Sequence, residues 1–186
     1  LLEKTFSAKE NKEITIKKAK AKNELSISKL AEKNAKQALK QKLIQSDTNN
    51  NLIETLAAKF QLNSNIDLIE VYDNSHIQGT DSIGAMICFG NEGFVKKRYR
   101  KFNIKDEKVK NDDYGMMKEV LFRRFSKAVK EKSGSLSLPE LIMIDGGKGQ
   151  YSVSREVLNE LGLHDLPILA VAKGKRRNAG EEKIYH

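Results

Sequence analysis

The sequence of 186 residues contains a single cysteine, Cys88. An internal disulfide and a cysteine-based zinc cluster are therefore excluded within this chain, and a reducing cytoplasm is the expected compartment. Long hydrophobic runs are also lacking, because the longest apolar stretches, residues 141–144 and 168–172, are far shorter than the roughly 20 residues that span a bilayer. The N-terminal residues alternate lysine with glutamate and do not form the apolar core of a signal peptide. We therefore expect no membrane partner.

Negative charge is in deficit, since 34 lysines and arginines face 25 aspartates and glutamates, a formal net charge of +9. Such an excess favours a phosphate-rich partner, because clustered cations gain affinity by displacing condensed counterions. The basic residues concentrate in residues 96–110, where Tyr99 and Phe102 are interleaved, and in residues 173–177. A solvated edge strand is the alternative explanation for the first run. The predicted nucleic-acid contacts are Lys96, Lys97, Arg98, Arg100, Lys148, Lys173 and Arg176.

The first third of the chain, residues 1–66, is predicted to be a linker followed by a helical extension. Residues 1–24 are polar and lysine-rich, which is typical of a linker or an edge element. Apolar residues then recur at three- and four-residue spacing over residues 27–43, which predicts an amphipathic helix that ends before a polar loop at residues 46–51. A second, shorter helix is expected over residues 52–60.

The remainder, residues 67–186, has the pattern of an α/β domain. Three β-rich runs separated by glycine-containing turns predict an antiparallel meander, and two further apolar runs alternate with helical patterns. The first of the two helices has Asp112 as its expected N-cap. The order predicts a mixed five-stranded sheet flanked by helices, with its last strands parallel. The strand runs are residues 68–72, 83–89, 94–102, 141–144 and 166–173, and the helices cover about 112–132 and 151–161.

Three aspartates lie at the ends of predicted elements. Asp73 and Asp145 each follow an apolar strand, and Asp113 lies in the first turn of the long helix. If the two strands are neighbours, about 4.8 Å apart, the carboxylates of Asp73 and Asp145 can bridge divalent cations at the sheet edge. Hard oxygen ligands suit Mg²⁺ or Mn²⁺. The alternative is that each aspartate only forms a turn or a cap.

Residues 145–150, with the sequence DGGKGQ, follow a strand and precede a helix. They do not match a phosphate-binding P-loop, because no serine or threonine follows Lys148 and the first glycine of that motif is missing. The glycines are interpreted as a place where a nucleic-acid backbone approaches closely, with Lys148 facing its phosphates. A tight strand-to-helix turn explains them equally well.

Five motifs in order make the pattern specific. The chain resembles the C-terminal nuclease domain of UvrC, the incision subunit of bacterial nucleotide-excision repair, over roughly residues 67–185. The resemblance implies an RNase H-like fold and a metal-dependent endonuclease that cuts damaged double-stranded DNA on the 5′ side of the lesion. It also implies UvrB as a partner, through a segment that this sequence does not contain. The motifs are YDNSHIQG, RYRKFNI, NDDYGMMKEVLFRRF, LIMIDGGKGQ and LAVAKGKRRNAGEE.

The resemblance also implies roles for single residues. Asp73, Asp113 and Asp145 match the acidic residues that the family uses in catalysis, with Asp73 and Asp145 as ligands of Mg²⁺ or Mn²⁺. The family pattern adds a catalytic histidine in a helix beyond the fifth strand, and the sequence ends at His186, which does not match that motif. Two hypotheses follow: an endonuclease domain, or a C-terminally truncated module that binds DNA or assembles with partners without catalysis.

Overall fold

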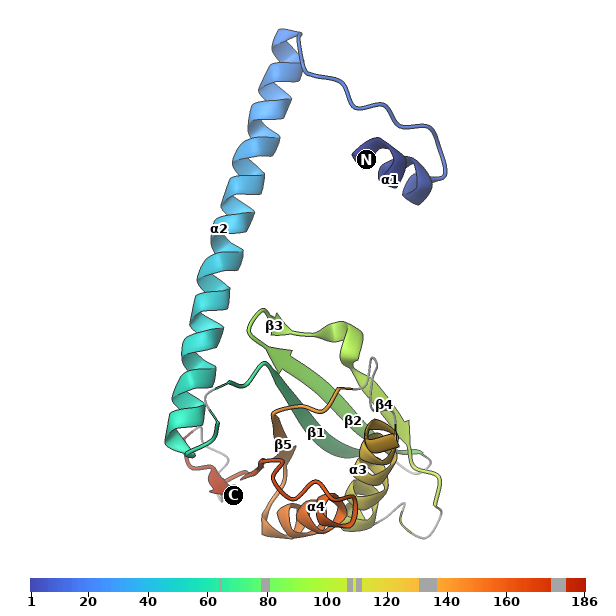
Figure 1. Cartoon of the computed structure of the whole chain (residues 1–186), viewed down its shortest axis with the longest axis vertical. Coiled ribbons are helices and arrows are strands. Elements are labelled where there is room, and N and C mark those ends of the chain that lie inside the picture. The colour runs from blue at the N-terminus through green and yellow to red at the C-terminus, as the bar shows by residue number, and fades with distance from the viewer. Residues whose placement is uncertain (64, 78–80, 107–108, 110–111, 131–136, 175–179) are drawn as a thin grey trace. The chain divides into compact units, whose positions relative to one another are not determined.

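The computed structural model describes residues 1–63, 65–77, 81–106, 109, 112–130, 137–174 and 180–186 (Figure 1), and of residues 75–77 and 81 it describes the backbone alone. The chain forms two compact units, Leu1–Ile44 and Gln45–His186. The first unit contains helix α1 (Leu2–Glu10) and the beginning of helix α2 (Lys22–Lys59). No helix in the described part of the chain combines the length and the apolar character that crossing a membrane requires.

The N-terminal prediction is wrong in two places. A helix, α1, forms within the stretch expected to be a linker or edge element, and α2 continues through residues 46–51 without the predicted loop. That segment contains neither glycine nor proline, the residues whose cost in a helix interior is largest, about 1 and 3 kcal/mol. Its Asn49 is buried and donates from Nδ2 to the backbone oxygen of Asn91 at 3.4 Å, so a polar residue is accommodated inside the helix.

The second unit is built on one mixed sheet. The predicted meander is confirmed, because β1 pairs antiparallel with β2, and β2 with both β3 and β4. The predicted parallel strands are also confirmed, since β5 pairs parallel with both β1 and β6. Within the described residues the order is β3-β2-β1-β5-β6-β7, with β4 also on β2. The strands are β1 Leu68–Ile77, β2 Asp81–Gly90, β3 Gly93–Phe94, β4 Arg100–Asn103, β5 Leu141–Asp145, β6 Ile168–Ala172 and β7 Lys183–Tyr185.

The described part of the sheet has seven strands, two more than predicted. The third predicted run is divided by a short 3₁₀ helix, η1 (Lys96–Arg98), into β3 and β4. Its residues did not alternate, and the backbone N–H of Val95 bonds to the Cys88 oxygen before the chain turns away. The last strand, β7, is only three residues long, too short to give a period-two pattern.

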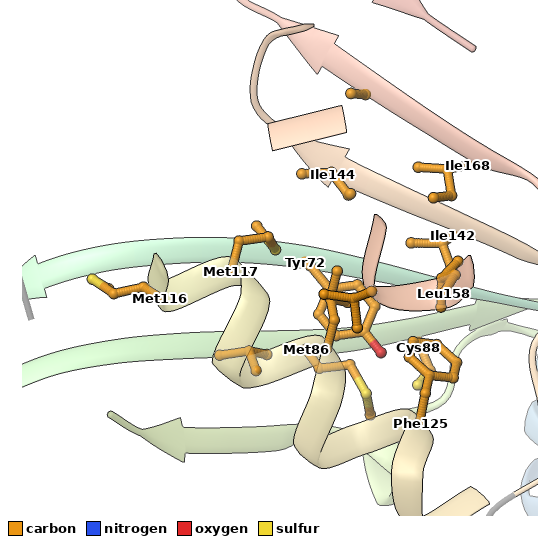
Figure 2. Close-up of a cluster of buried hydrophobic side chains, with 14 of the residues drawn as sticks. Tyr72, Met86, Cys88, Met116, Met117, Phe125, Ile142, Ile144, Leu158 and Ile168 are labelled. Carbon is orange, nitrogen blue, oxygen red and sulfur yellow. The ribbon is translucent and has the colours of Figure 1, made fainter. Parts of the chain in front are cut away.

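Two helices, α3 (Asp113–Lys130) and α4 (Lys148–Glu160), lie against one face of the sheet (Figure 1). The predicted N-cap is confirmed, because Asp112 Oδ1 accepts the backbone N–H of Tyr114 at 3.0 Å. Apolar side chains of α3 at helical spacing pack in one cluster with Tyr72 of β1, among them Met117 and Phe125 (Figure 2). Leu121 belongs to the same cluster.

The opposite face of the sheet is covered at one end by the second half of α2. Alternate residues of β1 point to the two faces, so Tyr72 belongs to the α3 side and Ile69 to the α2 side. Ile69 packs with Ile53 and Ala57 of α2, and with Leu141 of β5. The sheet is therefore fixed from both sides through β1 and β5, its central pair.

A charged pair lies inside the α3 face. Glu70 of β1 and Arg124 of α3 have side chains only 1% and 5% exposed, and Arg124 Nη2 lies 2.6 Å from Glu70 Oε1. The second carboxylate oxygen of Glu70 accepts a hydrogen bond from the Tyr72 hydroxyl at 2.5 Å. Arg124 Nη2 also donates to the backbone oxygen of Ser137 at 3.0 Å. The pair therefore connects β1, α3 and the segment that leads into β5.

Removing one member of this pair should be costly. Arg124→Met leaves the Glu70 carboxylate buried without its counter-charge, so the free energy of unfolding, measured by urea denaturation, should fall by about 3–5 kcal/mol. The double variant Glu70→Gln, Arg124→Met should recover much of that loss. Arg123→Met is the matched control, because the pair that Arg123 forms with Glu119 is partly exposed and is worth about 1 kcal/mol or less. Equal losses for Arg123→Met and Arg124→Met would contradict this account.

Candidate active site

The pairing of β1 with β5 brings two of the three predicted aspartates together. Tyr72 of β1 is in register with Ile144 of β5, and Asp73 and Asp145 are the next residues along these parallel strands. Asp113 is the first residue of α3. All three line one cavity of about 210 Å³, whose other described lining residues are Asn74, Met117, Gln150 and Lys173.

Charges of both signs meet in this cavity, named here the carboxylate cavity. Lys173 follows β6, the strand beside β5, and its Nζ donates to Asp145 Oδ2 at 2.9 Å. Burial raises the pKa of the Asp73 carboxyl above its usual value, and the neighbouring charge of Asp145 raises it further. Lys173 and the backbone N–H of Asn74 act in the opposite direction. Because the folded-state pKa of Asp73 is raised, this carboxyl contributes its full stabilisation at pH values below its unfolded-state pKa. That contribution is lost as the pH rises through the folded-state pKa.

The donor atoms of the cavity suit a hard divalent cation. Asp73, Asp145 and Asp113 supply carboxylate oxygens, and Asn74 Oδ1 is buried without a hydrogen-bond partner among the described residues. No cluster of three or more histidine, cysteine, aspartate or glutamate side chains in the described part of the chain is arranged to hold a metal by itself. Mg²⁺ is commonly bound by only one or two carboxylates, with water and substrate phosphate as the other ligands. The residues present fit a site of that kind.

The turn between β5 and α4 forms another wall of the cavity. Gly147 is the N-cap of α4, and its backbone N–H donates to Gln150 Oε1 at 3.0 Å. A Cβ on Gly149 would overlap the ring of Tyr114, and one on Gly146 would meet the side chain of Gln150. Gly146 therefore favours the tight strand-to-helix turn, the alternative interpretation of the DGGKGQ segment, and Gly149 allows α4 to approach Tyr114 of α3.

The predicted nucleic-acid contacts lie in different parts of the second unit. Lys96 and Lys97 are exposed on η1, while Arg98 donates from Nη1 to Ser137 Oγ at 3.0 Å. Arg100 of β4 is exposed, with Nη1 bonded to the backbone oxygens of Lys97 and Tyr99.

The other three predicted contacts are placed differently. Lys148 is exposed at the first position of α4. Lys173 is the member of the predicted set that lines the carboxylate cavity. Arg176 lies outside the described residues.

Sequence reasoning missed two polar residues of this cavity. Asn74 directly follows Asp73, and its Nδ2 donates to the backbone oxygen of Asp113 at 3.3 Å. Gln150 closes the DGGKGQ motif and holds the turn. The available signal was that Asn74 adjoins Asp73 and that Gln150 ends the motif that begins with Asp145. His186 was expected to have no catalytic role, and its ring packs edge-on against Phe60 of the helical extension, with the ring centroids 5.3 Å apart.

Comparison with known proteins identifies the family. The family model described as UvrC RNase H endonuclease domain matches residues 57–186. UvrABC system protein C of Hyphomonas neptunium is 44% identical over 190 residues, which cover 100% of this chain and 31% of that protein. The protein of the same name from Cereibacter sphaeroides is 48% identical over 158 residues, covering 83% and 25%.

A crystal structure of human ENDOV superimposes with a TM-score of 0.41 at 16% identity, covering 58% of this chain and 46% of that one. The chain spans less than a third of the length of the curated relatives named above. Because the family model matches more than half of the chain, and includes the sheet, α3, α4 and the three aspartates, the assignment is direct. The chain belongs to the UvrC family and contains its RNase H endonuclease domain.

Proposed function

We propose that this chain is a metal-dependent endonuclease domain that cuts damaged double-stranded DNA on the 5′ side of a lesion. The observation that carries the proposal is the convergence of Asp73, Asp113 and Asp145 on one cavity. The name of the relatives, UvrABC system protein C, supports a place in the UvrABC system. We propose UvrB as a partner and the cytoplasm as the compartment. Binding to UvrB would use a segment outside this sequence.

The chain's own residues have separable tasks in this proposal. Mg²⁺ or Mn²⁺, when bound, supplies positive charge for the scissile phosphate and lowers the pKa of an attacking water. Asp73 and Asp145 would hold that ion, and Asp113 would support the site from the start of α3. Lys173, held by Asp145, keeps a positive charge beside the position of the phosphate.

A second candidate is a module that binds DNA or assembles with partners without cutting. One observation favours it: no histidine is among the described residues that line the carboxylate cavity. His186 contacts Phe60, a residue of the cluster on the α2 side of the sheet. Nicking of DNA by the 186-residue chain itself would eliminate this candidate.

Loss of a carboxylate should stop the incision. In a full-length protein that contains this domain, Asp73→Asn should lower the rate of 5′ nicking of damaged duplex by about tenfold to a hundredfold, because a metal ligand or its orienting charge is lost. The matched control is Asp165→Asn, which makes the same chemical change at an exposed position after α4. The measurement is the nicking rate at saturating Mg²⁺ or Mn²⁺. A normal rate for Asp73→Asn would show that the assignment is wrong.

Basic residues around η1 should contribute to DNA affinity without sequence preference. Replacing four of them with alanine should reduce the salt slope of duplex binding by about 0.9 for each phosphate contact that is lost. The four are Lys96, Lys97, Arg98 and Arg100.

The matched control for this charge change uses four exposed lysines of α2, again replaced with alanine, and the slope is obtained from titrations at several salt concentrations. An unchanged slope for the η1 variant, or an equal reduction in the control, would move the DNA path elsewhere. The control residues are Lys29, Lys33, Lys36 and Lys40.

A further inference from the structure

A second cavity lies between α3 and β4, with a volume of about 480 Å³. It shares no described lining residue with the carboxylate cavity. Its lining on α3 begins nine residues after Asp113, so at 1.5 Å per residue this lining lies about 14–21 Å from Asp113 along the helix. Five of its described lining residues are cations: Arg100, Lys105, Arg123, Arg124 and Lys127. This space is named the basic cavity.

The positive charge of the basic cavity is only partly compensated. Glu70 neutralises Arg124, and Glu119 lies 2.8 Å from Arg123. Among the described residues, no carboxylate lines the cavity and none forms an ion pair with the other three cations. Arg124 Nη1 is buried in the wall and lacks a hydrogen-bond acceptor among the described residues. A concave surface with this charge is suited to an anion.

Two phenylalanines distinguish this cavity from a simple anion site. Phe122 of α3 is 47% exposed although it is a large apolar residue surrounded by charges. Phe102 of β4 lies beneath the guanidinium of Arg123, whose Cζ is 5.7 Å from the ring centroid. An exposed ring beside cations is the combination that binds single-stranded nucleic acid, because a base stacks on the ring while its phosphate meets the cations. An acidic peptide would use the cations and leave Phe122 without a role.

We propose that the basic cavity binds an unpaired nucleotide of a DNA strand. The base stacks on Phe122, and the phosphates contact Lys105 and Lys127. This inference rests on the proposed function, because the strand is the one that reaches the carboxylate cavity. The distance of about 14–21 Å from Asp113 corresponds to roughly four to six nucleotides at the 3.4 Å spacing of one DNA strand. Duplex DNA is disfavoured in the basic cavity because its bases are stacked on one another and present no free face to Phe122.

The test measures DNA binding under conditions that prevent DNA cleavage. The 186-residue chain carrying Asp73→Asn is titrated, with EDTA present, against a fluorescein-labelled 12-nucleotide single strand and against the matching duplex, and anisotropy is recorded. Phe122→Ala should weaken single-strand binding about fivefold to a hundredfold, the equivalent of one lost stack. Duplex binding should change by less than about twofold. Phe94→Ala removes another exposed ring as the control and should leave both affinities unchanged.

Charge is tested separately. Lys105→Ala with Lys127→Ala should lower the salt slope of single-strand binding by about 0.7 for each lost contact. The control pair, Lys29→Ala with Lys33→Ala on α2, has the same loss of charge and should leave that salt slope unchanged.

Unchanged single-strand affinity for Phe122→Ala overturns the proposal. An equal loss of affinity for duplex also overturns it, because that result would indicate phosphate contacts without base stacking. Normal nicking by Asp73→Asn in the separate cleavage assay would overturn the proposed function and would leave these binding results standing.

Discussion

The parallel pairing of β1 with β5 is the constraint on which the rest of the second unit depends. Parallel neighbours need a crossover, and the chain between them supplies β2, β3, β4 and then α3, which packs over one face. The crossover brings β1 and β5 side by side in the same direction, so that Asp73, in the middle of β1, lies next to Asp145 at the edge where β5 ends. The buried pair of Glu70 and Arg124 joins β1 to α3 beneath that edge. The fold therefore contains two arrangements that cost free energy: a desolvated charged pair in the core and carboxylates close together at the edge.

Most of the sheet was predictable because its strands are apolar and its turns contain glycine. The parallel order followed from alternating strand and helix patterns, and Asp112 was identified as a cap from its position before an apolar helical face. The unbroken α2 was not predictable from residues 46–51, whose polar composition resembles a loop. Asn49 is fixed there by a contact with Asn91, 42 residues away, and such long-range partners leave no local pattern. The three residues of β7 are likewise defined by their pairing with β6 and not by their own sequence.

The site was predictable in its carboxylates and less so in its cations. Asp113 and Asp145 stand at element ends, where a local pattern suffices to find them. Asp73 was predicted to follow its strand, but β1 continues to Ile77, and Asp73 instead follows the last residue of β1 that pairs with β5. Lys173 was assigned to DNA with the rest of a basic run, and only the neighbouring position of β5 and β6 shows that it meets Asp145. The basic cavity combines α3 with β4, so Lys105, Phe122 and Lys127 could not be grouped from the sequence. Charge in a sequence indicates the kind of partner, whereas the fold decides which charges act together.

The central claim is that Asp73 and Asp145 are brought together to hold one divalent cation. Crystals of the chain grown with Mn²⁺ and measured at a wavelength where manganese scatters anomalously test it directly. The account predicts one anomalous peak in the carboxylate cavity, in contact with oxygens of both Asp73 and Asp145. An anomalous peak elsewhere, or an empty cavity at saturating Mn²⁺ with Lys173 still bonded to Asp145, would contradict it.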